Sequence, residues 1–114
     1  MSHFTSIATK IVSAKHLVLA LNDLGFQTVE VHANPEPLIG YKGDTRVQKA
    51  HVIIRRQYIG SISNDIGFAQ NAQGTFDAVI SDYDRNTYDH AWLQKLTQRY
   101  AYHVSRDMLD QQHF

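Results

Sequence analysis

The chain contains no cysteine, which excludes disulfide bonds, iron–sulfur ligation and thiolate catalysis together. It also carries no net charge, because 11 basic and 11 acidic residues balance at neutral pH. No overall field therefore attracts it to DNA or to anionic lipid. Since long-range repulsion between copies is absent as well, self-association is favoured, and we expect a homodimer.

Long apolar runs and signal-like segments are also missing. No run approaches the roughly 20 apolar residues that span a bilayer, and the amino terminus lacks a basic segment followed by an apolar core. We expect a cytoplasmic or similar soluble setting and no membrane partner. The length of 114 residues predicts a single domain, residues 1–114.

Motifs for covalent and phosphate chemistry are incomplete. No Gly-x-Ser-x-Gly elbow occurs, and the nearest stretch, Gly60-Ser61-Ile62-Ser63, lacks the second glycine. The stretch Gly40-Tyr41-Lys42-Gly43-Asp44-Thr45-Arg46 combines two glycines with an aromatic ring and two cations, but it lacks the Walker spacing and no amphipathic helix follows it. We predict no cofactor and no catalytic residue, and we interpret this stretch as a loop that presents side chains to a partner.

Histidines and acidic residues raise the alternative of a metal-dependent enzyme. The seven histidines contain no pair at the i, i+4 spacing that places two ligands on one helical face, and with no cysteine we predict no metal site; they are His3, His16, His32, His51, His90, His103 and His113. Asp82 and Asp84 lie two apart near a strand end, so they are expected on one face, where a pair of carboxylates could bind a divalent cation. A solvated turn is the favoured interpretation of that pair.

Local patterns predict the first half of the fold. Residues 4–11 are typical of a strand with Ile7 and Ile11 on one face. A helix is predicted from an N-cap at Ser13 to a stop at Gly25, with Phe26 folding back in a Schellman motif. A second strand is predicted at residues 27–32, and the prolines that follow predict a loop from residue 34 onward.

The second half shows a central strand, a hairpin and a helix. Residues 50–55 are apolar on both faces, and Arg55 and Arg56 are expected to mark the exit of this strand toward water. Two strands around the turn at residues 71–74 predict an antiparallel hairpin, and a final helix, capped by Asn86 or Thr87, carries an apolar stripe at four-residue intervals from position 92 to 108. The order β-α-β-β-β-β-α predicts an α+β two-layer sandwich of about five mainly antiparallel strands, with both helices on one face.

Two candidate binding surfaces follow from the polar residues. The first is for a protein partner, with the residues Tyr41, Lys42, Arg46, Arg99 and Tyr102. The alternative is single-stranded nucleic acid, bound by Lys42, Arg46, Lys49, Arg55 and Arg56 with tyrosines available to stack on bases. The zero net charge disfavours nucleic acid, so we predict a non-enzymatic protein-interaction or regulatory module.

Several motifs together resemble a known family. They are Met1-Ser2-His3-Phe4-Thr5-Ser6-Ile7, Asp23-Leu24-Gly25-Phe26, the glycine-tyrosine stretch at residues 40–46, Asp65-Ile66-Gly67-Phe68 and Thr97-Gln98-Arg99-Tyr100-Ala101-Tyr102. In this order they are similar to the cyanobacterial and plastid family called hypothetical chloroplast open reading frame thirty-five. The resemblance implies a source among photosynthetic microbes or their phages and a cytoplasmic or stromal location. It implies no activity, because that family is a domain of unknown function.

Overall fold

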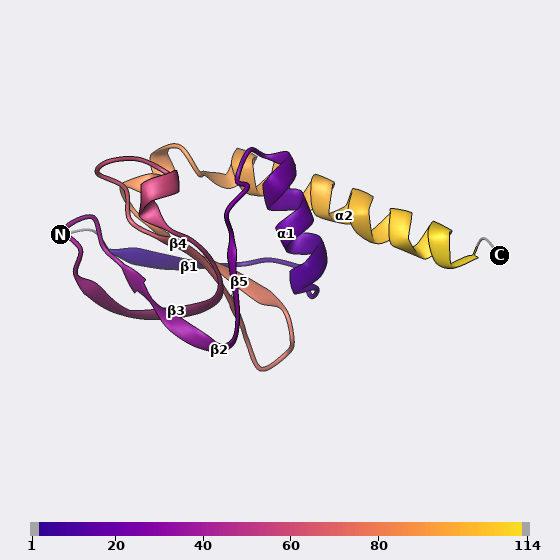
Figure 1. Ribbon diagram of the computed structural model, residues 1–114, viewed down its shortest axis with the longest axis horizontal. Helices are drawn as coiled ribbons and strands as arrows, with labels where there is room; N and C mark the ends of the chain where they lie inside the picture. The colour runs from indigo at the N-terminus through magenta and orange to yellow at the C-terminus, as the bar shows by residue number, and fades with distance from the viewer. Residues whose placement is uncertain (1–2, 113–114) are drawn as a thin grey trace.

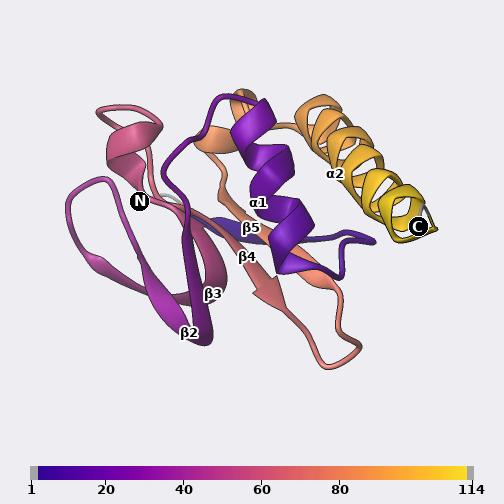
Figure 2. The ribbon, with the colours of Figure 1, turned by 45° about the vertical axis from the view of Figure 1, so that its right-hand side comes forward.

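The computed structural model describes residues 3–112, so Met1, Ser2, His113 and Phe114 lie outside the described residues. Within this range, one antiparallel sheet has the strand order β1-β5-β4-β3-β2 (Figure 1). The strands are β1 (Phe4–Ala8), β2 (Glu30–Ile39), β3 (Thr45–Ile54), β4 (Ile66–Gln70) and β5 (Phe76–Ser81), and the helices are α1 (Ala14–Asp23) and α2 (His90–Gln112). This order confirms the predicted α+β class, with both helices on the same side of the sheet (Figures 1 and 2).

The first strand is shorter than predicted. β1 ends at Ala8, because from Thr9 onward side-chain bonds replace the regular ladder. The hydroxyl of Thr9 donates to the carbonyl of Phe76 at 2.5 Å, and Phe76 N–H donates to the carbonyl of Ile11 at 2.8 Å. Ile11 is fully buried in the core, on the same side as Ile7, as the alternation predicted.

Helix α1 begins and ends as the sequence predicted. The Ser13 side chain accepts a hydrogen bond from the backbone N–H of His16 at 3.3 Å, which caps the helix. At the other end, Phe26 N–H donates to the carbonyl of Leu21 and Gly25 N–H to that of Asn22, each at 3.0 Å. These two bonds are the Schellman motif.

The predicted loop after residue 34 is wrong, because β2 continues through both prolines to Ile39. β2 is an outer strand of the sheet, where a missing N–H costs no ladder hydrogen bond. Its register with β3 shifts between Val31 and Glu36 and again between Pro37 and Ile39. Such irregularities are where an edge strand accommodates proline.

The hairpin of β2 and β3 curls over the sheet face that the helices leave free. Its residues Leu38, Ala50 and Ile53 form a second apolar cluster with Val79 of β5. The curl brings the start of β3 across the sheet, and the guanidinium carbon of Arg46 lies 5.3 Å from the ring centroid of Phe4 on β1. The hairpin therefore touches the opposite edge of the sheet.

The hairpin of β4 and β5 is confirmed, with Gly74 at a φ of +88° in its turn. The last helix starts later than the predicted cap at Asn86 or Thr87. Asn86 lies in a short 3-10 turn, η2 (Asp84–Asn86), and the residue that caps α2 is Asp89, whose carboxylate accepts from Trp92 N–H at 3.0 Å. Both Asn86 and Asp89 fit the capping preference, and the buried position of Leu93 selects the later start.

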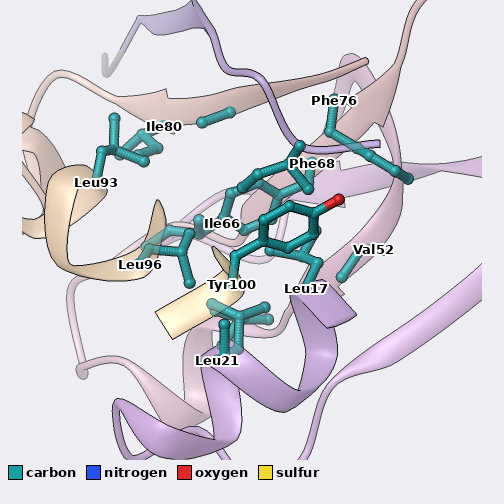
Figure 3. Packing of buried hydrophobic residues seen from close by; sticks show 14 residues of the cluster. Leu17, Leu21, Val52, Ile66, Phe68, Phe76, Ile80, Leu93, Leu96 and Tyr100 are labelled. Carbon is teal, nitrogen blue, oxygen red and sulfur yellow. The ribbon is translucent and has the colours of Figure 1, made fainter. Parts of the chain in front are cut away.

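The main core lies between the helices and the sheet (Figure 3). Leu17 and Leu21 of α1 and Leu96 of α2 meet Phe68 and Val52 of the central strands. In the same layer, the Tyr100 hydroxyl accepts hydrogen bonds from the N–H groups of Val12 and Ser13 at 3.0 and 3.1 Å. α2 thus fixes the segment that leads into α1.

The predicted apolar stripe of α2 is buried only in part. Val104 still packs against the core, but Met108 is 57% exposed, because the last turns of α2 extend beyond the sheet (Figure 1). This extension makes the molecule long, with principal extents of 52 × 26 × 22 Å.

Gly67 provides a test of how closely the hairpin approaches β4. A Cβ atom at this position would lie 2.5 Å from the Cβ of Ala50 and 2.9 Å from Leu38. We expect Gly67→Ala to lower the free energy of unfolding by about 1–3 kcal/mol, because a packed core cannot absorb the added atom without strain. Chemical denaturation measures the change. Ala50→Gly introduced into Gly67→Ala should restore part of the loss, and a Gly67→Ala variant as stable as the wild type would contradict the packing described.

Candidate functional site

The predicted glycine-tyrosine loop is a tight turn between β2 and β3. Gly40 N–H donates to the carbonyl of Asp44 and Gly43 N–H to that of Gly40, each at 2.8 Å. Tyr41 N–H donates to Asn64 Oδ1 at 2.9 Å, and Lys42 Nζ lies 5.6 Å from the centroid of the Tyr41 ring. Lys42 is exposed and Tyr41 half-buried, so the turn presents one cation and one ring edge.

Arg46 belongs to β3 and is held within the fold. Its side chain is 16% exposed, stacks over Phe4 and pairs with Asp44 at 3.3 Å. Its contact with Phe4 ties the turn to the start of β1 at one end of the molecule, while α2 extends toward the other end (Figures 1 and 2).

The other cations of the nucleic-acid alternative are not gathered on one open surface. Arg55, predicted to exit toward water, instead donates to Glu30 through Nε and Nη2 and to the buried Asp65 through Nη1, each at 2.8 Å. Arg56 donates to the carbonyls of Ser63 and Ser61. These two arginines serve the fold, because they satisfy acceptors at the junction of β2, β3 and β4. Lys49 is exposed on β3.

Asp65 is the centre of this junction. It is fully buried, and its carboxylate accepts from Ile39 N–H and Arg56 N–H, each at 2.7 Å, besides Arg55. Hydrogen bonds from Arg55, aided by His32, lower the pKa of Glu30 from 4.5 to about 2. The pKa of Arg55 is raised, first by Glu30 and then by Asp65.

Arg99 and Tyr102 do lie together on α2. The guanidinium carbon of Arg99 is 4.4 Å from the Tyr102 ring centroid, and Arg99 Nε donates to Asp23 Oδ2 at 2.8 Å. His103 Nε2 lies 2.7 Å from the same oxygen. Hydrogen bonds from Arg99 and then His103 lower the pKa of Asp23. This pair therefore sits where α2 meets the end of α1, away from the Tyr41 turn.

The predicted solvated turn at Asp82 and Asp84 is confirmed for Asp82 and is wrong for Asp84. Asp82 is exposed just after β5, whereas Asp84 is 2% exposed and accepts hydrogen bonds from Asn64 and Ser81. The chain turns into η2 after Ser81, so the two-residue alternation that would align both side chains stops there. Across residues 3–112, no three side chains of the metal-ligating types converge. In the same range, no helix is both long enough and apolar enough to cross a bilayer.

A feature that the sequence did not indicate is the outer edge of β1. Asp82 N–H donates to the carbonyl of His3 at 2.8 Å, and in the β1–β5 register Thr5 faces Ile80 and Ile7 faces Ala78. In an antiparallel pair, every second residue directs both its backbone N–H and its C=O group to the neighbouring strand. The backbone groups of His3, Thr5 and Ile7 therefore point toward β5. The N–H and C=O groups of the other set, Phe4, Ser6 and Ala8, point outward, and no group within residues 3–112 bonds to them.

A groove runs beside this edge. It has a volume of about 650 Å³ and lies between β1 and the first half of α2. Ile7 and Leu93 provide apolar surface, and Gln94, Thr97 and His90 provide polar surface. Local sequence patterns predicted both elements, but only the strand order reveals that β1 is an unpaired edge beside α2.

Most of the chain matches a known protein family. Residues 20–114 match the family DUF1257, described as a protein of unknown function. The chain belongs to the DUF1257 family. The DUF1257 match begins within α1, so it covers β2–β5 and α2 and leaves β1 outside. No curated protein and no solved structure showed significant similarity to this DUF1257 protein.

The Glu30–Arg55 pair predicts a dependence of stability on acid. A carboxyl group whose pKa is depressed in the folded state stabilises the fold above its ordinary pKa and loses that contribution as protons bind. We therefore expect the Glu30 contribution to be complete above pH 4.5 and to fall progressively down to about pH 2. Unfolding free energies measured between pH 7 and pH 2 should decline less steeply in Glu30→Gln than in the wild type.

Glu36 offers a matched control, since it is exposed on the same strand and takes part in no ion pair among residues 3–112. Glu36→Gln should keep the wild-type slope. Equal slopes for Glu30→Gln and the wild type would show that the pair does not govern the acid response.

Proposed function

We propose that this DUF1257 protein is a non-enzymatic protein-interaction or regulatory module that holds an extended segment of a partner along the outer edge of β1. The unpaired N–H and C=O groups of Phe4, Ser6 and Ala8 carry this proposal. An exposed strand edge is a template for another strand, and its main-chain hydrogen bonds supply affinity without requiring a particular sequence.

The groove supports the proposal because its lining would select which partner segments can bind along the edge. Alternate side chains of an added strand would point to the helix side of the sheet, where Ile7 and Leu93 lie. Among residues 3–112, Lys10 is the only lysine, arginine, aspartate or glutamate that lines the groove. A partner segment with small or medium apolar residues at every second position, flanked by polar residues, matches this lining.

The Tyr41 turn is the proposed second contact. The stacking of Arg46 on Phe4 supports this, since a segment that runs past the start of β1 would next meet Tyr41 and Lys42. Tyrosine and a nearby cation are common anchors in protein interfaces. Arg99 and Tyr102 lie on the side of α2 that faces the end of α1. A partner bound by these two residues would therefore not share the surface formed by the β1 edge and the Tyr41 turn.

The biological setting of the proposal comes from the resemblance described above. We propose that the protein acts in a photosynthetic microbe or its phage, in the cytoplasm or the plastid stroma. The match of residues 20–114 to a family of unknown function is compatible with this setting. Fractionation of a source organism, followed by immunodetection, tests the location.

Ser6→Pro tests the β1 edge. Proline removes one outward N–H, and edge strands tolerate it because no internal hydrogen bond is lost. We expect the unfolding free energy to change by less than about 1 kcal/mol, while partners captured from a host lysate by the wild type are lost. In the purified complex, the amide hydrogens of Ser6 and Ala8 should exchange far more slowly than in the free protein.

Ala33→Pro is the matched control, because Ala33 is exposed on β2, the opposite edge strand. This variant should retain the captured partners. Amides of Ser6 and Ala8 that exchange equally fast with and without the partner would refute binding at the edge. A captured second copy of the chain, lost in Ser6→Pro, would identify the occupant as the predicted homodimer.

The Tyr41 turn is tested separately with Tyr41→Ala. If the turn anchors the partner, the dissociation constant should rise about fivefold or more, which corresponds to about 1 kcal/mol. Tyr58→Ala is the control, since Tyr58 is 47% exposed outside the proposed surface. Calorimetry or surface plasmon resonance with the purified partner measures both. Equal affinities for the two variants would remove the turn from the interface.

A further inference from the structure

A second pocket, separate from the β1 edge, lies between the segment after η1 (Arg56–Tyr58) and the turn η2. Its volume is about 380 Å³. Its walls include Ile59 and Ile62 on one side and Tyr83, Thr87 and Tyr88 on the other, with Asp84 between them.

Asp84 is the unusual group in this pocket, because it is only 2% exposed and forms no ion pair with residues 3–112. Its hydrogen bonds all fall on Oδ2, which accepts from Ser81 Oγ at 2.8 Å, from Asn64 N–H at 2.9 Å and from Asn64 Nδ2 at 3.5 Å. Among residues 3–112, no side chain bonds to Oδ1, and no lysine, arginine or histidine pairs with the carboxylate. Oδ1 keeps accessible surface, so a donor in the pocket can reach it and give this carboxylate a further hydrogen bond.

The pocket walls suit a positively charged group. Besides Asp84, the pocket lining formed by residues 3–112 contains no acidic or basic residue. Burial raises the pKa of the Tyr88 hydroxyl, and the nearby Asp84 carboxylate raises it further. Tyr88 is fixed by edge-on packing against Trp92 at 5.1 Å, and tyrosine rings attract cations.

The opposite wall is also held in place. Arg56 donates to the carbonyls of Ser63 and Ser61 at 3.0 and 2.7 Å, and Ser63 N–H donates to the carbonyl of Gly60 at 3.1 Å. A pocket whose walls are fixed before binding loses little conformational entropy when it is occupied.

We propose that this pocket binds an ammonium or guanidinium group on a short aliphatic stem, with the charged nitrogen at Asp84 Oδ1 and the stem between Ile59 and Ile62. Such a group is carried both by small amines and by lysine or arginine side chains of a protein. This inference does not depend on the β1 edge, because it rests on a different set of residues.

The test uses n-butylammonium and n-butylguanidinium as probes and n-butanol as the uncharged probe of the same length. Amide shifts of the pocket residues Ser61, Ser63, Thr87 and Tyr88 are followed by NMR during titration. We expect saturable shifts with both cations and none of comparable affinity with n-butanol. Equal responses to n-butanol would overturn the proposal, because an apolar cleft alone would explain them.

A variant of Asp84 and a matched control at Asp82 test whether the Asp84 carboxylate binds the cation. Asp84→Asn should weaken cation binding about tenfold or more, as expected when a charge-assisted hydrogen bond is lost. Asp82→Asn removes an exposed carboxylate two residues away and should bind as the wild type does. If both variants bound the cations equally weakly, the loss of any nearby negative charge would explain the result. That outcome would overturn the proposed site at Asp84.

Asp84→Asn can also disturb the bonds to Asn64 and Ser81, so a variant that keeps the carboxylate is needed. Thr87 is exposed on the pocket wall, and Thr87→Phe should fill the pocket and abolish the saturable shifts while the thermal unfolding midpoint stays unchanged. Undiminished binding in folded Thr87→Phe would overturn the proposal.

Tighter binding of the peptide Gly-Arg-Gly than of n-butylguanidinium would identify a protein side chain as the source of the group, and the reverse order would identify a small molecule.

Discussion

The buried carboxylate of Asp65 is the interaction on which the arrangement of the sheet depends. It receives the backbone N–H groups of Ile39 and Arg56 and the guanidinium of Arg55, and its own N–H donates to the carbonyl of Ile39 at 3.0 Å. The end of β2, the exit of β3 and the entry to β4 are therefore fixed at one point. A buried charge requires this complete set of partners, since the loss of any one leaves a desolvated polar group.

This junction determines where the β2–β3 hairpin goes. Asp65 joins Ile39, next to the turn of the hairpin, to Arg55 and Arg56 at the exit of β3. The hairpin curls over the face that the helices leave free, and Arg46 reaches Phe4 on the far edge. The helices cover one face and the hairpin covers part of the other. The outer edge of β1 is then left beside α2 with three residues whose backbone groups bond to nothing within residues 3–112.

The same junction explains why the basic residues are not a nucleic-acid surface. Arg55 and Arg56 follow an apolar strand in the sequence, which is the usual position of a cation that leaves the core for water. In the structure, these two side chains donate to the carboxylates of Glu30 and Asp65 and to the carbonyls of Pro37, Ser61 and Ser63. Charge in the sequence therefore overestimates the charge available to a ligand.

Local rules were sufficient where neighbours in the sequence make the decisive contacts. The Ser13 cap and the Schellman motif at Gly25 join residues three to five positions apart, and the β4–β5 hairpin pairs residues six to 12 positions apart. All three were predicted. The rules were insufficient for β2, because proline is excluded from a sheet interior but accepted at an edge, and strand order is a property of the whole sheet. The predicted solvated turn is wrong for Asp84 for a similar reason, since the strand ends at Ser81 and Asp84 turns inward while Asp82 stays exposed.

The sequence by itself determined the α+β class, the order of the elements and the periodic faces that form the core, because these depend on residue spacing along each element. The tertiary structure alone decided which edge stays unpaired, which arginines are consumed by the fold and which aspartate is buried beside a pocket. Many of the contacts behind those outcomes join residues far apart in the sequence, and no local pattern encodes such distances. Arg55 and Asp65 are 10 positions apart, Arg55 and Glu30 are 25 apart, and Arg99 and Asp23 are 76 apart.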